Sequence, residues 1–82
     1  MIKVCFFASL RETLDTGSVS LSAEGLHCVA DIIAHLVAEN PAWRDALSQP
    51  NLLVAVNQVH ATPNQSVSDG DEVAIFPPVT GG

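Results

Sequence analysis

The first residues of the chain alternate between two sets of side chains, as residues of a β-strand do. This period predicts a strand over residues 2–8. Its predicted core face carries Ile2, Val4, Phe6 and Ala8, and its other face carries Lys3, Cys5 and Phe7. Asp15-Thr16-Gly17 then predicts a turn. Alternation over residues 18–22 predicts a half-exposed strand that forms a hairpin with the first strand.

A stretch with helical periodicity follows. Apolar residues recur three and four positions apart, which predicts a helix with one apolar stripe. The stripe consists of Val29, Ile32, Ile33, Leu36 and Val37. Cys28 takes the predicted N-cap position, and Asp31 suits the positive end of the helix dipole. Asn40-Pro41 is predicted to end this helix and begin a shorter one, with Trp43 as a packing residue.

Residues 52–56 form a continuous apolar run, which predicts a central strand covered on both faces. Asn57-Gln58 predicts a turn into a short extended segment at residues 59–61, followed by a loop over residues 63–68.

A tight turn is predicted at Asp69-Gly70-Asp71, before a last strand over residues 73–76. Val73 and Ile75 are expected to face inward, and Phe76 outward. Pro77-Pro78 cannot continue a sheet ladder, because proline lacks the N–H group.

The order of these elements predicts an α+β fold, in which one main helix packs across one face of a mixed sheet. The last strand is a candidate neighbour of the first, although the order alone allows other arrangements. We expect one domain over residues 1–77 and a flexible C-terminal tail over residues 78–82.

Composition and charge narrow the function. Of the 82 residues, 48% are apolar, which suits a domain with its own core. The net charge of −6 disfavours nucleic acid as a ligand, because phosphate backbones bind clustered Lys and Arg. The negative charge either complements a basic cleft on a partner or serves only to keep the protein soluble. We expect no membrane association and a cytoplasmic location, because the chain shows no long apolar run and no signal peptide.

Chemistry-bearing residues are sparse. Cys5 and Cys28 form no disulfide framework, and neither lies in a cluster with metal-ligand spacing, so we predict no metal site and no bound cofactor. The three histidines are scattered, and no acid/base constellation can be argued from their spacing. We therefore expect no catalytic activity from this chain alone.

The last residues carry the strongest functional signal. Two terminal glycines make a backbone thin enough to enter a narrow active site, although chance alone also produces such endings. The proline pair before them favours an extended start to the tail. A terminal carboxylate at Gly82 would be ionised at neutral pH and able to attack an α-phosphate held by another protein. Thr80 offers a hydroxyl inside such a site or is a generic polar residue.

The whole chain resembles the ubiquitin-like β-grasp fold, and within it the small, sulfur-carrying subunits of molybdopterin synthase (MoaD type). Asp-Gly-Asp before the last strand is shared by many β-grasp proteins, whereas the ending is far more specific. The matching segments are Ile2-Lys3-Val4, Phe6-Phe7-Ala8, Leu10-Arg11-Glu12, Ala55-Val56-Asn57-Gln58, Asp69-Gly70-Asp71-Glu72-Val73-Ala74 and Phe76-Pro77-Pro78-Val79-Thr80-Gly81-Gly82.

The resemblance implies a carrier protein. A partner similar to ubiquitin-activating enzymes (MoeB type) would use ATP to adenylate the carboxylate of Gly82, and a persulfide donor would convert it to a thiocarboxylate, a 1-thioglycine. The large synthase subunit (MoaE type), in a heterotetramer of two small and two large subunits, would supply the catalytic residues. It would take up the tail residues Pro78, Val79, Thr80 and Gly81. The sulfur would pass to cyclic pyranopterin monophosphate and build the molybdopterin dithiolene.

The partner interface is predicted around the root of the tail. Phe7, Phe76 and His60 are expected to form one exposed apolar patch, and such patches mark partner sites. Arg11 either contacts an acid of the partner or pairs with Glu12 or Asp15.

Three other functions stay open. The chain is alternatively a sulfur carrier for the thiamine thiazole or cysteine pathway, a ubiquitin-like modifier joined to lysines, or an interaction domain whose tail is inert. Lys3 is the only lysine, which weakly disfavours chains of the protein built on itself.

Overall fold

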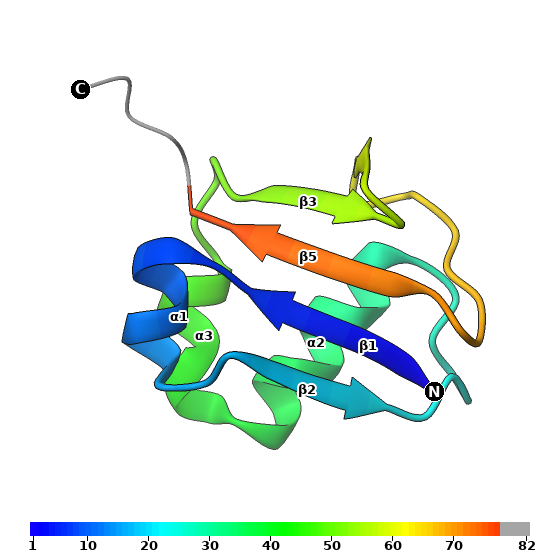
Figure 1. Cartoon of the computed structure of the whole chain (residues 1–82). Coiled ribbons are helices and arrows are strands. Elements are labelled where there is room, and N and C mark those ends of the chain that lie inside the picture. Colours follow the sequence, from blue (N-terminus) through cyan, green and yellow to red (C-terminus); the bar gives the residue numbers. More distant parts are fainter. Residues whose placement is uncertain (78–82) are drawn as a thin grey trace.

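Five strands form one mixed sheet in the computed structural model, which describes residues 1–77 (Figure 1). The spatial order is β2-β1-β5-β3-β4. The strands are β1 (Ile2–Phe6), β2 (Ser18–Leu21), β3 (Leu53–Val56), β4 (Val59–Ala61) and β5 (Glu72–Phe76). The last strand lies beside the first and parallel to it, while the other neighbouring strands pair antiparallel. The predicted mixed sheet is confirmed.

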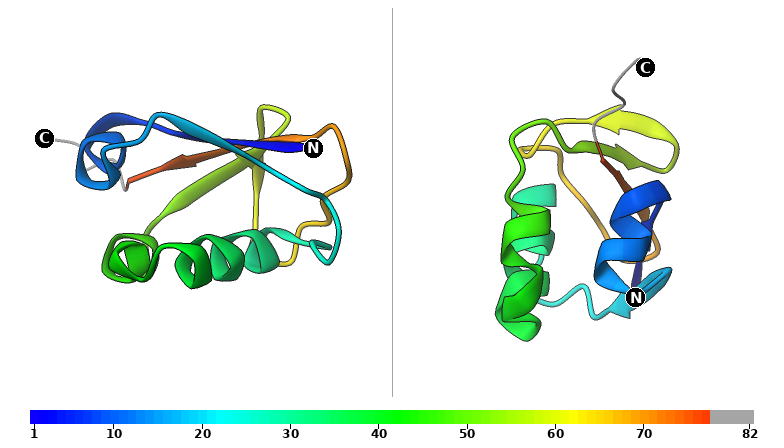
Figure 2. Two further views of the ribbon diagram at one scale, coloured as in Figure 1. Left: turned by 90° about the horizontal axis from the view of Figure 1, so that it is seen from below. Right: turned by 90° about the vertical axis from the view of Figure 1, so that its left-hand side faces the viewer.

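The helices lie on one face and at one end of this sheet (Figure 2). They are α1 (Ala8–Leu14), α2 (Val29–Glu39), the 3-10 turn η1 (Pro41–Trp43) and α3 (Arg44–Leu47). Figure 2 shows α2 running across that face, with α1 at the end of the sheet where β5 ends. The opposite face of the sheet, here called the outer face, carries no helix within residues 1–77.

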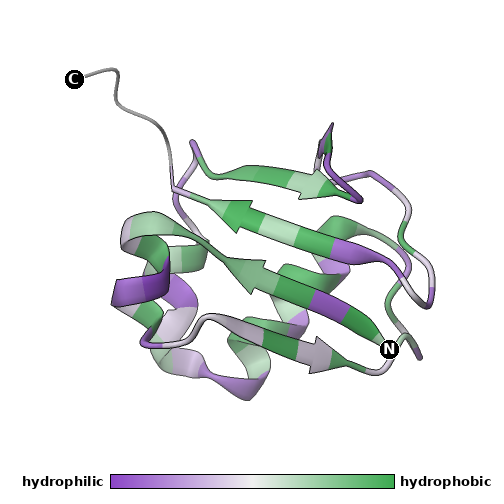
Figure 3. Ribbon diagram, in the orientation of Figure 1, coloured by the Kyte–Doolittle hydropathy of each residue, from purple (hydrophilic) through white to green (hydrophobic). Residues whose placement is uncertain are grey.

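The core lies between the sheet and α2. Its most deeply buried side chains are Phe6, Ile2, Ile32, Leu36, Ile75, Val4, Val29 and Val73. The apolar stripe predicted for the main helix supplies three of them, and Figure 3 shows the hydrophobic residues along the strands. Trp43 packs its ring edge-on against Phe6, with centroids 5.5 Å apart, as expected for a packing residue.

The segment after β1 corrects the sequence-based prediction. Strand β1 ends at Phe6, and the chain turns at Ala8, whose φ of 54° lies in the left-handed region and whose side chain is exposed. Helix α1 follows and buries Leu10 and Leu14, which lie four residues apart on one face. The predicted antiparallel pairing of the first two strands is confirmed, but a helix connects them instead of a tight hairpin turn.

The N-terminus of α2 uses a different cap from the usual one. Cys28 is the N-cap residue, as predicted, but its side chain makes no capping hydrogen bond. Instead, the Asp31 carboxylate accepts a 2.9 Å hydrogen bond from the backbone N–H of His27, and this bond lowers the pKa of Asp31. The acid in the first turn therefore holds the chain at the start of the helix.

Strand β3 also differs from expectation. It lies inside the sheet, between β5 and β4, but it is covered on one face only. Val54 and Val56 are buried in the core, whereas Leu53 and Ala55 are half-buried on the outer face. The continuous apolar run thus supplies the core and also an apolar outer surface.

Candidate functional site

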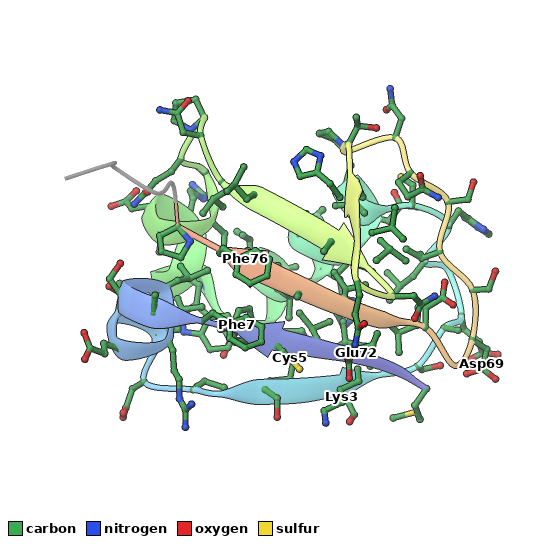
Figure 4. All side chains as sticks on the ribbon, turned by 45° about the horizontal axis from the view of Figure 1, so that its top comes forward. Lys3, Cys5, Phe7, Asp69, Glu72 and Phe76 are labelled. Atoms are coloured by element: carbon green, nitrogen blue, oxygen red, sulfur yellow. The ribbon has the colours of Figure 1, made fainter. Side chains whose placement is uncertain are left out.

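Two phenylalanines meet on the outer face where β5 ends. Phe7 directly follows β1, and its N–H donates to the Ile75 carbonyl at 3.2 Å, which extends the parallel ladder by one residue. The rings of Phe7 and Phe76 stack with centroids 5.0 Å apart and planes 24° apart (Figure 4). Phe7 keeps 43% of its surface exposed. A stacked, solvent-facing aromatic pair thus stands at the root of the predicted tail.

An open cavity of about 480 Å³ adjoins this pair. We call it the outer-face cavity; its lining comes from β3, β4 and β5, from the β3–β4 turn and from the residue after β1. The lining residues are Phe7, Leu53, Val54, Ala55, Gln58, His60, Glu72, Ala74 and Phe76. The sheet register explains this gathering, because Leu53 lies opposite Phe76, and Ala55 lies opposite both Ala74 and His60. Small alanines between larger side chains create the hollow.

The polar lining residues come from the β3–β4 turn and from the strands beside it. Gln58, His60 and Glu72 are all exposed, and we call them the polar end of the cavity. Within residues 1–77, no ion pair and no side-chain hydrogen bond occupies the Glu72 carboxylate or the His60 imidazole. Both groups are therefore available to an incoming molecule.

The turn at this end of the cavity is held by side-chain hydrogen bonds. Asn57 and Gln58 have φ values of 50° and 70°, which suit a two-residue hairpin turn. Asn57 donates to the Asp71 carboxylate at 3.0 Å and accepts from the Glu72 N–H at 3.0 Å. The hydrogen bond from Asn57 is the main cause that lowers the pKa of Asp71, and the Ser68 N–H adds to it. We call this network the Asn57–Asp71 clamp.

Arg11 lies apart from the cavity. It lines a separate surface hollow beside helix α1, formed by residues 8–9, 11–12 and 15–17. Among the described residues it forms no ion pair, so neither Glu12 nor Asp15 is its partner. The structure therefore brings together Phe7, His60 and Phe76 but not Arg11.

The other predicted site residues, Pro78, Val79, Thr80, Gly81 and Gly82, lie outside the described residues. Sequence reasoning missed several lining residues of the cavity, namely Leu53, Ala55, Gln58 and Glu72. The apolar character of Leu53 and Ala55 is the available signal, but an apolar run predicts burial between two layers equally well.

Within residues 1–77, no three His, Cys, Asp or Glu side chains gather as a metal site would require. No helix in this part of the chain is long and apolar enough to cross a membrane.

The sequence is similar to those of known carrier proteins. The sequence matches the ThiS family over residues 4–82. It is 44% identical to the molybdopterin synthase sulfur carrier subunit of Escherichia coli over 82 residues, covering 100% of both chains. It is 39% identical to the molybdopterin synthase sulfur carrier subunit of Haemophilus influenzae, again with 100% of both chains covered.

The fold is also similar to that of a solved structure. The crystal structure of SAMP1 from Haloferax volcanii superimposes with a TM-score of 0.81 at 30% identity, covering 99% of this chain and 98% of that one. The expected ubiquitin-like β-grasp fold is thereby confirmed. The chain belongs to the ThiS family of β-grasp proteins, and within it to the group that contains the sulfur carrier subunits of molybdopterin synthase.

Proposed function

We propose that this chain is the sulfur carrier subunit of a molybdopterin synthase. The observation that carries the proposal is the outer-face cavity, with the stacked Phe7 and Phe76 at the root of the predicted tail. An exposed apolar hollow in that position suits docking to a larger protein that receives the tail. Full-length similarity to two proteins with this printed name supports the same function.

In this proposal, sulfur is loaded onto the carboxylate of the last residue. The carboxylate of Gly82 attacks the α-phosphate of ATP on an activating enzyme, and pyrophosphate leaves. The acyl adenylate has a good leaving group, AMP, which the outer sulfur of a persulfide donor displaces to give an acyl disulfide. A second thiol then cleaves the S–S bond, so that Gly82 leaves as a thiocarboxylate and the donor sulfur remains in a disulfide with that thiol. The chain itself supplies no catalytic base, because the carboxylate is already ionised at neutral pH.

Transfer of the sulfur takes place on a partner. The relatives are named subunits of a synthase, which supports a second subunit as the partner. We assign the catalytic residues to that subunit, which the family resemblance implies to be the larger one. In this proposal the outer-face cavity docks on that large subunit, in a heterotetramer of two small and two large chains. Residues 78–82 enter its active site, where cyclic pyranopterin monophosphate accepts the sulfur.

An intact mass measurement tests the carrier role. The chain is purified after co-expression with its activating enzyme and sulfur donor, and a form with one sulfur in place of one oxygen is expected. A variant with Gly81 and Gly82 deleted is the matched control and stays unmodified. Absence of the sulfur-bearing form from the complete chain, under conditions that load a known carrier, contradicts the proposal.

A second function is attachment to other proteins. The similarity to SAMP1 favours it, because a curated relative, the small archaeal modifier protein 1 of Haloferax volcanii, is 32% identical to this chain. Conjugation would end in an isopeptide bond to a lysine of the target. Immunoblots of whole-cell extract distinguish the two functions, since a modifier gives slowly migrating adducts that resist thiols and disappear with the Gly81-Gly82 deletion.

A further inference from the structure

The two halves of the outer-face cavity differ in chemistry, which limits what can dock there. We infer that the cavity takes a partner segment with an apolar side chain next to an arginine or lysine. The apolar side chain fills the hollow, and the cation reaches the polar end at Gln58, His60 and Glu72. The inference rests on the proposed function, because the segment is assigned to the large synthase subunit, and it adds the chemistry by which that subunit is recognised.

The apolar half is shaped for one inserted side chain. Phe7 and Phe76 form its wall beside the predicted tail, and Ala55 and Ala74 leave the space between them open. Leu53 lies opposite Phe76 and closes the hollow on the β3 side. Anchors of this kind dominate interface energies when they fill a pocket from which water is excluded.

Glu72 supplies the negative charge. Among residues 1–77, its carboxylate is the only charged group of fixed sign that lines the cavity. Lys3 is its register neighbour on β1, yet within residues 1–77 the two do not form an ion pair. A docked arginine would supply donors in a planar fork that suits a carboxylate.

His60 adds a hydrogen-bonding group to the polar end of the cavity. It lies opposite Ala55 on β3, which offers no polar side chain, and the polar groups that share the cavity with it are Glu72 on β5 and Gln58 in the turn. A neutral imidazole has one nitrogen that accepts a hydrogen bond. Such a nitrogen suits a donor group on the partner's arginine or lysine.

The charge of the whole chain agrees with a basic partner surface. The net charge is −6, so a carboxylate brought to the polar end would meet Glu72 and a generally negative molecule. A second copy of the chain would carry the same charge and the same Glu72. Charge complementarity therefore favours the large subunit with a basic residue over self-association.

A titration of the chain with the large subunit of the same organism tests the inference. Glu72→Arg should weaken binding by about tenfold or more, and Glu72→Gln by less, because reversal adds repulsion to the lost attraction. Glu24→Arg, which lies outside the cavity, is the matched control.

The outcomes separate this inference from the proposed function. If the unmodified chain binds and Glu72→Arg binds equally well, the cation is wrong while the function stands. If the unmodified chain does not bind the large subunit at all, the proposed function fails and the inference fails with it. A dimer of the free chain in sedimentation, dissolved by Phe76→Asp but not by Glu72→Arg, would assign the cavity to a second copy and overturn the inference.

Discussion

Phe76 contacts one neighbour through its backbone and another through its side chain. Its backbone closes the β3–β5 ladder opposite Leu53, and its ring stacks on Phe7. The side chain is half-buried and lies on the outer face, so it contributes little to the core between the sheet and α2. A residue in this position can be changed with little effect on the fold and a large effect on docking.

Replacing Phe76 with Asp should therefore weaken binding to the large subunit by about tenfold to a hundredfold, because the aromatic anchor is lost and a charge is buried. Isothermal titration calorimetry measures the affinity, and circular dichroism checks that the free chain is folded. Val59→Asp is the matched control, since Val59 is 68% exposed and does not line the cavity. Equal affinity of Phe76→Asp and the unmodified chain would remove Phe76 from the interface.

Ile32 represents the opposite kind of residue. It has no exposed surface and lies on the face of α2 that packs against the sheet. Ile32→Ala should lower the free energy of unfolding by about 2–5 kcal/mol, through lost transfer energy and the cavity left behind. Urea denaturation measures the change, and Ala34→Ser on the exposed side of α2 is the control. A loss below about 1 kcal/mol would mean that the core closes around the smaller side chain.

At the scale of elements, the connections between strands define the outer face. The Asn57–Asp71 clamp joins the β3–β4 turn to the start of β5, through hydrogen bonds of 3.0 Å on both sides of the Asn57 amide. Asp71 also accepts from the Ser68 N–H at 2.8 Å, which fixes the Asp-Gly-Asp turn. The clamp places Gln58 and Glu72 at the same end of the cavity.

The clamp predicts a pH dependence of stability. The pKa of Asp71 is lowered in the folded chain, so folding favours the ionised carboxylate. Its contribution is complete above the unfolded-state pKa, about 3.9, and is lost as the pH falls toward the lower folded-state pKa. In denaturation curves from about pH 7 down to pH 2.5, Asp71→Asn should lose less stability than the unmodified chain.

Other carboxylates also contribute to the loss of stability in acid. The pKa values of Asp69 and Asp31 are lowered too, mainly by hydrogen bonds from the N-terminal ammonium of Met1 and from the His27 N–H respectively, so Asp71→Asn should reduce the acid sensitivity only in part. Asp45→Asn, which removes a carboxylate of α3 outside the clamp, is the matched control. Identical pH profiles for Asp71→Asn and the unmodified chain would show that the clamp does not contribute to folding.

At the scale of the whole molecule, the residues that stabilise the fold are different from the residue proposed to carry the sulfur. The described core lies between the sheet and α2, whereas the proposed acyl group is Gly82, outside the described residues. A change at the last residues should therefore affect sulfur loading without affecting the core. This separation suits a carrier that must be handled by more than one partner.

Adding residues after Gly82, or changing Gly81 to Val, should abolish sulfur loading while the melting temperature stays within about 2 °C of the unmodified chain. An extension removes the free carboxylate, and a Cβ atom at Gly81 widens the thin tail. Intact mass after the loading reaction and a thermal melt measure the two effects. Thr80→Ser keeps the tail slender and is the control. Normal loading of Gly81→Val would show that the receiving site is wider than proposed.

Local patterns in the sequence determined much of this protein. The helical stripe of α2, the alternation in β1 and β5 and the Asn57-Gln58 turn all follow from preferences within a few residues, and the structure confirms them. Helix α1 was missed because its signal is only two buried leucines in seven residues, preceded by an aromatic residue that continues the strand pattern.

Only the tertiary structure decided what lies against each face. Leu53 and Ala55 are apolar, and a sequence pattern cannot tell whether a second layer covers them, because burial depends on segments distant along the chain. The meeting of Phe7, His60 and Glu72 around one cavity likewise depends on strand order and register. The chain's own periodicity determines its elements, whereas long-range pairing determines the surface that it offers to a partner.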